Sequence, residues 1–70
     1  MNKVTNIQDI GSIVREYRLR NNITQEELAI LANLSRKVII DLEKGKASIQ
    51  FTVIEKILKV TDLKLWIEIP

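Results

Sequence analysis

The chain repeats apolar residues at a helical spacing over most of its length. The first periodic segment runs from about residue 9 to residue 20, and Asp9 is its expected N-cap. Its apolar stripe follows the spacing i, i+3, i+4 and i+7 and consists of Ile10, Ile13, Val14 and Tyr17. Asn21 and Asn22 tolerate turn geometry, so we expect the helix to end before them.

A second, shorter helix is predicted to begin at Gln25. Thr24 and Glu27 have the spacing of a capping box, and Ile23 and Leu28 can pack together beside it as a hydrophobic staple. The predicted buried stripe combines leucines with small residues that permit close approach of a neighbouring helix: Leu28, Ala29, Leu31 and Ala32. Asn33 is the expected C-terminal cap, which limits the helix to about two turns.

A third helix is predicted to follow the second after a very short connection. Ser35 is its expected N-cap, and Gly45 suits the left-handed conformation that ends a helix. The inward side consists of Leu34, Ile39 and Leu42. A fourth helix is predicted over about residues 50–60, with an apolar stripe of Phe51, Ile54, Ile57 and Leu58.

The period changes to two near the C-terminal end, which predicts a strand over residues 63–70. The alternating apolar residues are Leu63, Leu65, Ile67 and Ile69. We expect Leu65 and Ile67 to be buried over the helices. A lone strand leaves unpaired backbone groups at both edges, and the only other candidate strand runs from Lys3 to Ile7.

Pairing of this strand with a second copy would satisfy its backbone groups by two-fold symmetry. We therefore expect a homodimer in which the residues that carry the contact are Leu63, Leu65, Trp66, Ile67 and Ile69. Trp66 lies on the other side of the strand from the aliphatic residues. It either covers the dimer seam, which we favour, or anchors a partner protein.

Composition narrows the function classes. The chain has 70 residues, enough for one small core, with 46% hydrophobic and 29% charged residues. It contains no His and no Cys, which removes zinc-finger, thiol and imidazole chemistry and argues against an enzyme. The formal charge of +2 permits an anionic partner without requiring one. We expect no cofactor and no metal.

Two short helices with a tight connection, the second rich in cations, form the arrangement that places a helix in the DNA major groove. The sequence also resembles the lambda-repressor-like, XRE-type helix-turn-helix family. The matching positions are Ile10-Gly11, Arg15, Arg18, the run from Ile23 to Ala29, Leu34-Ser35, Ile39, and the run from Leu42 to Lys46. With its C-terminal strand the chain is most similar to HipB-like antitoxins.

The resemblance implies which residues contact double-stranded DNA. Gln25 would contact a phosphate and brace the recognition helix, and the positions that would face DNA are Ser35, Arg36, Lys37 and Asp41. Arg36 and Lys37 have donors that suit guanine O6 and N7, although both could also form a merely solvated basic surface. Lys44 and Lys46, on either side of Gly45, would meet a phosphate or simply complement the end of the helix.

The resemblance also implies a structural ion pair between Arg18 and Glu43 across the first and third helices. Asp41 would repel phosphate unless it accepts a hydrogen bond from cytosine N4 or pairs with Lys37. Val38 and Ile40 stand where the family usually has hydroxyl residues.

Three apolar residues lie off the core stripes of their helices: Leu19, Ile30 and Ile40. Ile40 could contact a thymine methyl group or, together with Leu19 and Ile30, another protein.

Together these observations predict an all-α domain of four helices with a dimerising strand. The expected parts are an N-terminal arm (1–8), a helix-turn-helix domain (9–62) and the strand (63–70). The expected function is a cytoplasmic repressor that binds a palindromic operator and makes no membrane contact, and the resemblance to HipB-like antitoxins implies an antitoxin whose partner is a HipA-like kinase toxin. The alternatives are a stand-alone XRE-type regulator and a protein-interaction module without DNA binding.

Overall fold

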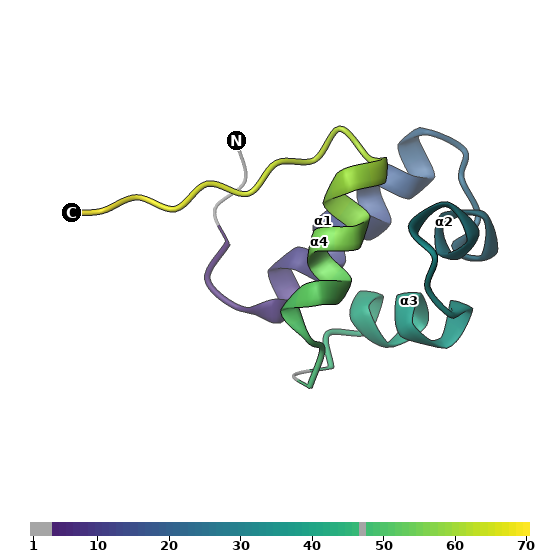
Figure 1. Ribbon diagram of the computed structural model, residues 1–70, viewed down its shortest axis with the longest axis horizontal. Coiled ribbons are helices and arrows are strands. Elements are labelled where there is room, and N and C mark those ends of the chain that lie inside the picture. The colour runs from purple at the N-terminus through teal and green to yellow at the C-terminus, as the bar shows by residue number, and fades with distance from the viewer. Residues whose placement is uncertain (1–3, 47) are drawn as a thin grey trace.

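The computed structural model describes residues 4–46 and 48–70, and this part of the chain contains four helices (Figure 1). They are α1 (Ile7–Arg20), α2 (Gln25–Ala32), α3 (Arg36–Glu43) and α4 (Phe51–Val60). α3 packs against both α1 and α2, and α2 also packs against α4. The predicted all-α body is therefore confirmed. None of these helices is long and apolar enough to cross a membrane.

The start of α1 differs from the prediction. The N-cap is Asn6, whose side chain accepts a hydrogen bond from the backbone N–H of Asp9 at 3.1 Å. Asp9 is therefore in the first turn, where its carboxylate accepts 2.8 Å hydrogen bonds from the N–H and the hydroxyl of Thr5. These bonds lower the pKa of Asp9. The helix starts earlier because Ile7 already packs against the core.

The caps of α2 and α3 agree with the predictions. Thr24 Oγ1 accepts from the Glu27 N–H at 3.0 Å, and Glu27 Oε1 accepts from the Thr24 N–H at 2.9 Å. Asn33 ends α2 with φ 55° and ψ 49°, and the Ser35 hydroxyl accepts from the Val38 N–H at 3.2 Å. The chain thus turns from α2 to α3 in three residues.

The core lies where the four helices meet. Its buried residues are Val14, Leu28, Ala29, Ala32, Ile39, Leu42 and Ile57. Gly11 allows α1 to approach α3 closely, because a Cβ at this position would overlap the carbonyl oxygen of Leu42. This contact fixes the distance between α1 and the helix that carries the predicted DNA contacts.

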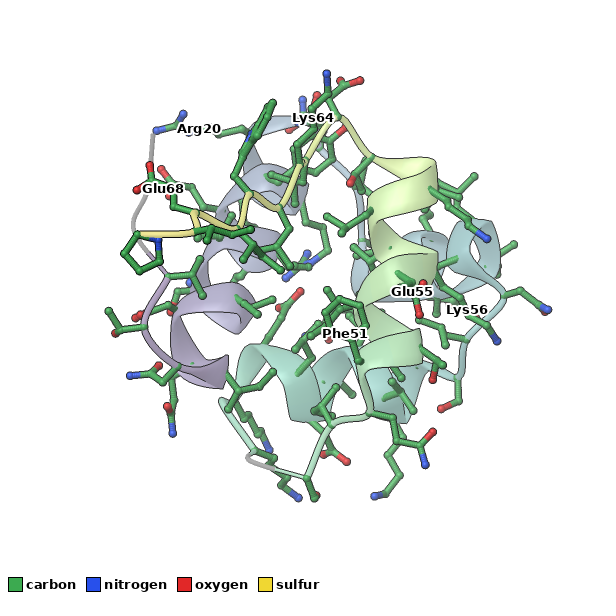
Figure 2. The ribbon with its side chains drawn as sticks, turned by 60° about the vertical axis from the view of Figure 1, so that its left-hand side comes forward. Arg20, Phe51, Glu55, Lys56, Lys64 and Glu68 are labelled. Carbon is green, nitrogen blue, oxygen red and sulfur yellow. The ribbon has the colours of Figure 1, made fainter. Side chains whose placement is uncertain are left out.

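Two residues that we predicted to be buried lie at the surface. Leu31 and Phe51 are each 56% exposed. The buried side of α2 runs through Leu28, Ala29 and Ala32, and this orientation turns Leu31 outward. Phe51 is the first residue of α4 (Figure 2), and the buried part of that helix begins at Ile54.

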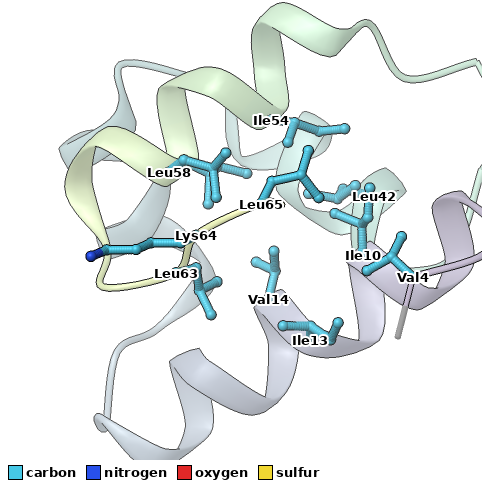
Figure 3. A pocket seen from close by; sticks show the side chains of 11 residues that line it. Val4, Ile10, Ile13, Val14, Leu42, Ile54, Leu58, Leu63, Lys64 and Leu65 are labelled. Carbon is cyan, nitrogen blue, oxygen red and sulfur yellow. The ribbon is translucent and has the colours of Figure 1, made fainter. Parts of the chain in front are cut away.

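The C-terminal segment 63–70 is extended, and no strand is assigned within the described residues. Leu63 and Leu65 are half-buried and line a small apolar hollow between α1 and α4 (Figure 3). The segment then leaves the helices (Figure 1), so Ile67 and Ile69 are 84% and 93% exposed. The predicted burial of Ile67 by the helices of its own chain is therefore wrong.

An N-terminal strand does not supply the missing pairing partner. Ile7 begins α1, and Asn6 is its N-cap, so the C-terminal half of the predicted Lys3–Ile7 strand is helical or capping. Lys3 lies outside the described residues.

Candidate nucleic-acid interface

The N-terminal half of α3 presents its polar side chains to solvent. Ile39 and Leu42 anchor the helix in the core, and they orient Ser35, Arg36 and Lys37 toward the exterior. Arg36 and Lys37 are the first two residues of the helix, and both are exposed. This is the end of a recognition helix that usually reaches base edges.

The outer side of α3 continues as a stripe with one residue per turn. Ile40 follows Arg36 by four residues and Lys44 follows Ile40 by four, which places the three on one side of the helix. Lys44 is exposed and Ile40 is half-buried between these two cations. Lys44 is the C-cap of α3, and Gly45 follows with φ +77°, as predicted.

Asp41 joins two of the predicted DNA-facing lysines. Its Oδ2 lies 3.2 Å from Lys37 Nζ, and its Oδ1 lies 3.3 Å from Lys46 Nζ. The Asp41 side chain is only 20% exposed. The hydrogen bond from Lys37, reinforced by Lys46, lowers the pKa of Asp41, so its carboxylate is ionised at neutral pH.

A network of hydrogen bonds joins Glu43, the last residue of α3, to α1 and α2. Arg18 Nε and Nη2 donate to the two carboxylate oxygens of Glu43 at 2.9 and 3.0 Å, and their side chains are 10% and 4% exposed. Arg18 Nη1 donates to the carbonyl oxygen of Ile23 at 3.0 Å. Gln25 Nε2 also donates to Glu43, at 3.2 Å.

The bonds with Glu43 raise the pKa of Arg18, which stays protonated. Gln25 thus supports α3 through Glu43 and remains half-buried. The network fixes the C-terminal end of α3, at Glu43, relative to α1 and to the turn before α2, and thereby sets the orientation of the whole helix.

A groove runs beside the N-terminal ends of α2 and α3. Three of its polar lining residues are Arg15, Asn22 and Arg36, and Gln25 lies at its inner side. Arg15 and Asn22 are exposed residues that the sequence reasoning did not include among the DNA contacts. The helical spacing could have indicated Arg15 as a candidate DNA contact, because it precedes Arg18 by one turn and therefore lies on the same side of α1.

Of the remaining predicted residues, Leu19 also lines this groove, whereas Ile30, Val38 and Trp66 lie outside it. Leu19 and Ile30 are exposed, whereas Val38 is half-buried. Trp66 is exposed on the C-terminal segment, where it lines a shallow hollow together with Leu58 and Lys64. No group of three or more potential metal-ligating side chains occurs within the described part of the chain.

A family model described as helix-turn-helix matches residues 14–65, which is most of the chain. The chain belongs to the XRE-type helix-turn-helix family. The matched range includes the network, both short helices and α4.

Curated relatives in this family carry regulator names. The chain is 44% identical over 52 residues to "Uncharacterized HTH-type transcriptional regulator y4mF" of Sinorhizobium fredii (strain NBRC 101917 / NGR234). That match covers 74% of this chain and 64% of the relative, so the chain spans less than two thirds of the relative's length. An HTH-type transcriptional regulator of Archaeoglobus fulgidus is 38% identical over 52 residues, with 74% and 73% covered.

Solved structures share the complete fold. A chain described as "HipB-O4 20mer complex" superposes with a TM-score of 0.86 at 22% identity, covering 96% of this chain and 94% of that chain. A chain of "Structure of HipA-HipB-O2-O3 complex" gives the same values. At this identity the likeness establishes the fold alone.

Proposed function

We propose that the chain is a sequence-specific DNA-binding transcription regulator. The observation that carries this proposal is the exposed cationic start of α3, on a helix whose last residue, Glu43, is tied to α1 by Arg18. A fixed helix orientation matters because base reading requires donors at fixed positions. The regulator names of the family relatives support the same function.

The proposed interface divides into base-reading and phosphate-binding residues. Arg36 and Lys37 would donate to base edges in the major groove, with Ser35 and Ile40 beside them. Lys44 and Lys46 would bind phosphates at the C-terminal end of α3, and Gln25 and Arg15 would do so from the groove at its other end. Phosphate contacts at both ends would set the orientation of the helix in the groove.

We propose further that the operator is palindromic and is bound by a homodimer. The C-terminal segment supports this, because its backbone is extended and its apolar residues Trp66, Ile67 and Ile69 are exposed. Antiparallel pairing with a second copy would satisfy the backbone groups of both. Two recognition helices would then bind half-sites about 34 Å apart, one turn of the DNA helix.

The finer proposal is an antitoxin that represses its own operon and binds a HipA-like kinase. It is supported by the likeness to chains described as HipB, one of them in a complex with HipA. Exposed Leu19, Ile30 and Trp66 offer apolar surface for a protein partner. Co-purification with the product of an adjacent kinase gene would test the partner separately from DNA binding.

Selection of duplexes from a random pool by the purified protein tests the central proposal. We expect a palindromic consensus, with log affinity falling linearly with log salt because phosphate contacts release counterions. Failure to enrich any sequence, together with affinity that does not depend on salt, would favour a protein-interaction module instead.

A further inference from the structure

Asp41 is an acidic side chain paired with two cations of the proposed interface. It accepts from Lys37, one turn earlier on α3, and from Lys46, in the loop after α3. Both lysines are far more exposed than Asp41, at 82% and 55% of their side chains against 20%. The carboxylate is therefore the less accessible member of both ion pairs, and each of its oxygens binds one lysine.

This arrangement changes what the lysines offer to DNA. Each ammonium group keeps N–H donors beyond the one directed at Asp41, so contact with DNA stays open. The three side chains together carry a charge of +1 instead of +2. Each ion pair also narrows the range of positions that its ammonium samples, compared with an unpaired lysine side chain.

The two effects act differently on the two kinds of DNA binding. Binding to arbitrary sequences depends almost entirely on charge, so it weakens when a carboxylate offsets two cations. Binding to a preferred sequence also depends on donors placed at base edges, and a lysine held in position serves that purpose. Asp41 would thus weaken the first kind more than the second.

We propose that Asp41 is a specificity-determining residue that restrains Lys37 and Lys46 and thereby suppresses binding to arbitrary DNA. The inference rests on the proposed DNA-binding function and adds to it a residue that opposes DNA binding at the interface. Asp41 would thus increase selectivity by lowering the affinity for arbitrary sequences, just as specific proteins often include features that disfavour a wrong partner.

The test compares Asp41→Asn with Glu55→Gln by fluorescence anisotropy. Both changes remove one negative charge, but Glu55 lies on the exposed side of α4 (Figure 2). The probes are a labelled duplex of random sequence and a duplex selected by the wild-type protein. Thermal melting followed by circular dichroism verifies that each variant is folded.

We expect Asp41→Asn to raise the affinity for the random duplex about threefold, the size expected for one charge a few Å from a phosphate in water. The slope of log affinity against log salt should steepen by up to about one. The affinity for the selected duplex should rise less, so the ratio of the two affinities falls. Glu55→Gln should change either affinity by less than about 1.5-fold, because salt screens distant charges.

A double-mutant cycle separates restraint of the lysine from simple repulsion by the carboxylate. If Asp41 restrains Lys37, then Lys37→Gln weakens binding to the random duplex more in the Asp41→Asn background than in the wild type. Additive effects, or equal effects of Asp41→Asn and Glu55→Gln, would overturn the inference while leaving the proposed function intact. A wild-type protein that binds neither duplex at low salt would overturn both.

Discussion

The helical body and the C-terminal segment differ in how far they bury their apolar side chains and pair their polar groups. In the body, Thr24, Ser35 and Asn6 cap their helices. Arg18 and Glu43 form an ion pair that is almost completely buried between α1 and α3. In the segment 63–70, only Leu63 and Leu65 are partly covered, and the following apolar residues are open to solvent. The body therefore buries its core within one chain, whereas the segment leaves Trp66, Ile67 and Ile69 exposed.

The largest expected effect is that of removing the segment after Asp62. The proposed dimer should dissociate at micromolar concentration, and affinity for a full palindrome should fall by about 10²–10⁴-fold as avidity is lost. The half-site preference should persist, because the body carries it. Analytical ultracentrifugation and anisotropy measure both quantities.

A full-length protein with Ile67→Lys and Ile69→Lys provides the matched variant. It retains the partly covered Leu63 and Leu65, yet it places charges on the exposed apolar residues. If this variant and the truncated protein both remain dimers, the dimer interface lies elsewhere in the molecule.

Arg18→Ala should lower the stability of the helical body and leave the C-terminal segment unaffected. Glu43 would keep a nearly buried carboxylate without its main partner, at a cost of about 2–3 kcal/mol of unfolding free energy. The control is Arg20→Ala, which removes an exposed pair with Glu16 worth less than about 0.5 kcal/mol. Urea denaturation measures the difference, and equal losses for the two variants would contradict a structural role for Arg18.

Arg36→Ala should alter sequence reading without affecting the body or the dimer. We expect specific affinity to fall by about 1–3 kcal/mol, with relaxed preference at one or two base pairs of each half-site. Lys46→Ala should instead weaken binding to all sequences. Binding measured over a panel of single-base operator variants distinguishes the two patterns, and a uniform loss for Arg36→Ala would reassign it to phosphate contact.

The smallest expected effect is a dependence of stability on acid. Hydrogen bonds from the backbone N–H and the side chain of Thr24 lower the pKa of Glu27 below its ordinary value of 4.5. A group with a lowered folded-state pKa stabilises the fold above its unfolded value, and this contribution is lost as the pH falls through the folded value. Unfolding free energy should therefore decrease as the pH falls below about 4.5.

Glu27→Gln should make that decrease less steep, because glutamine does not titrate in this range. Thermal melts between pH 3 and pH 7 measure the slope. An unchanged slope in this variant would mean that other carboxylates account for the acid sensitivity.

Features that depend on neighbouring residues were predictable from the sequence. The Thr24–Glu27 box, the Ser35 cap and the left-handed Asn33 each involve residues a few positions apart, so their spacing identifies them. Orientation of whole helices was less predictable. Leu31 fits a helical stripe as well as Ala32 does, and only the packing of α3 and α4 decides which of the two is buried.

In the candidate site, too, local spacing predicted some features, whereas others depend on how distant parts of the chain come together. The exposure of Arg36 and Lys37 follows from their places before the first core residue of α3, and the Lys37–Asp41 pair follows from helical spacing. The contact of Lys46 with Asp41 does not, because it depends on the path of the loop through Gly45. The burial of Ile67 was mispredicted because period-two alternation identifies the sides of a strand but not the surface that covers them.

Gly45 also has a consequence for how such an interface can vary. Its positive φ disfavours any side chain, and a Cβ there would collide with Gln8 at the start of α1. Lys44 and Lys46, directly beside it, are both exposed. Point mutations at the flanking codons can therefore change the charge of this loop while Gly45 preserves its path. Under the proposed function, mutations at Lys44 would adjust the strength of DNA binding without altering Arg36.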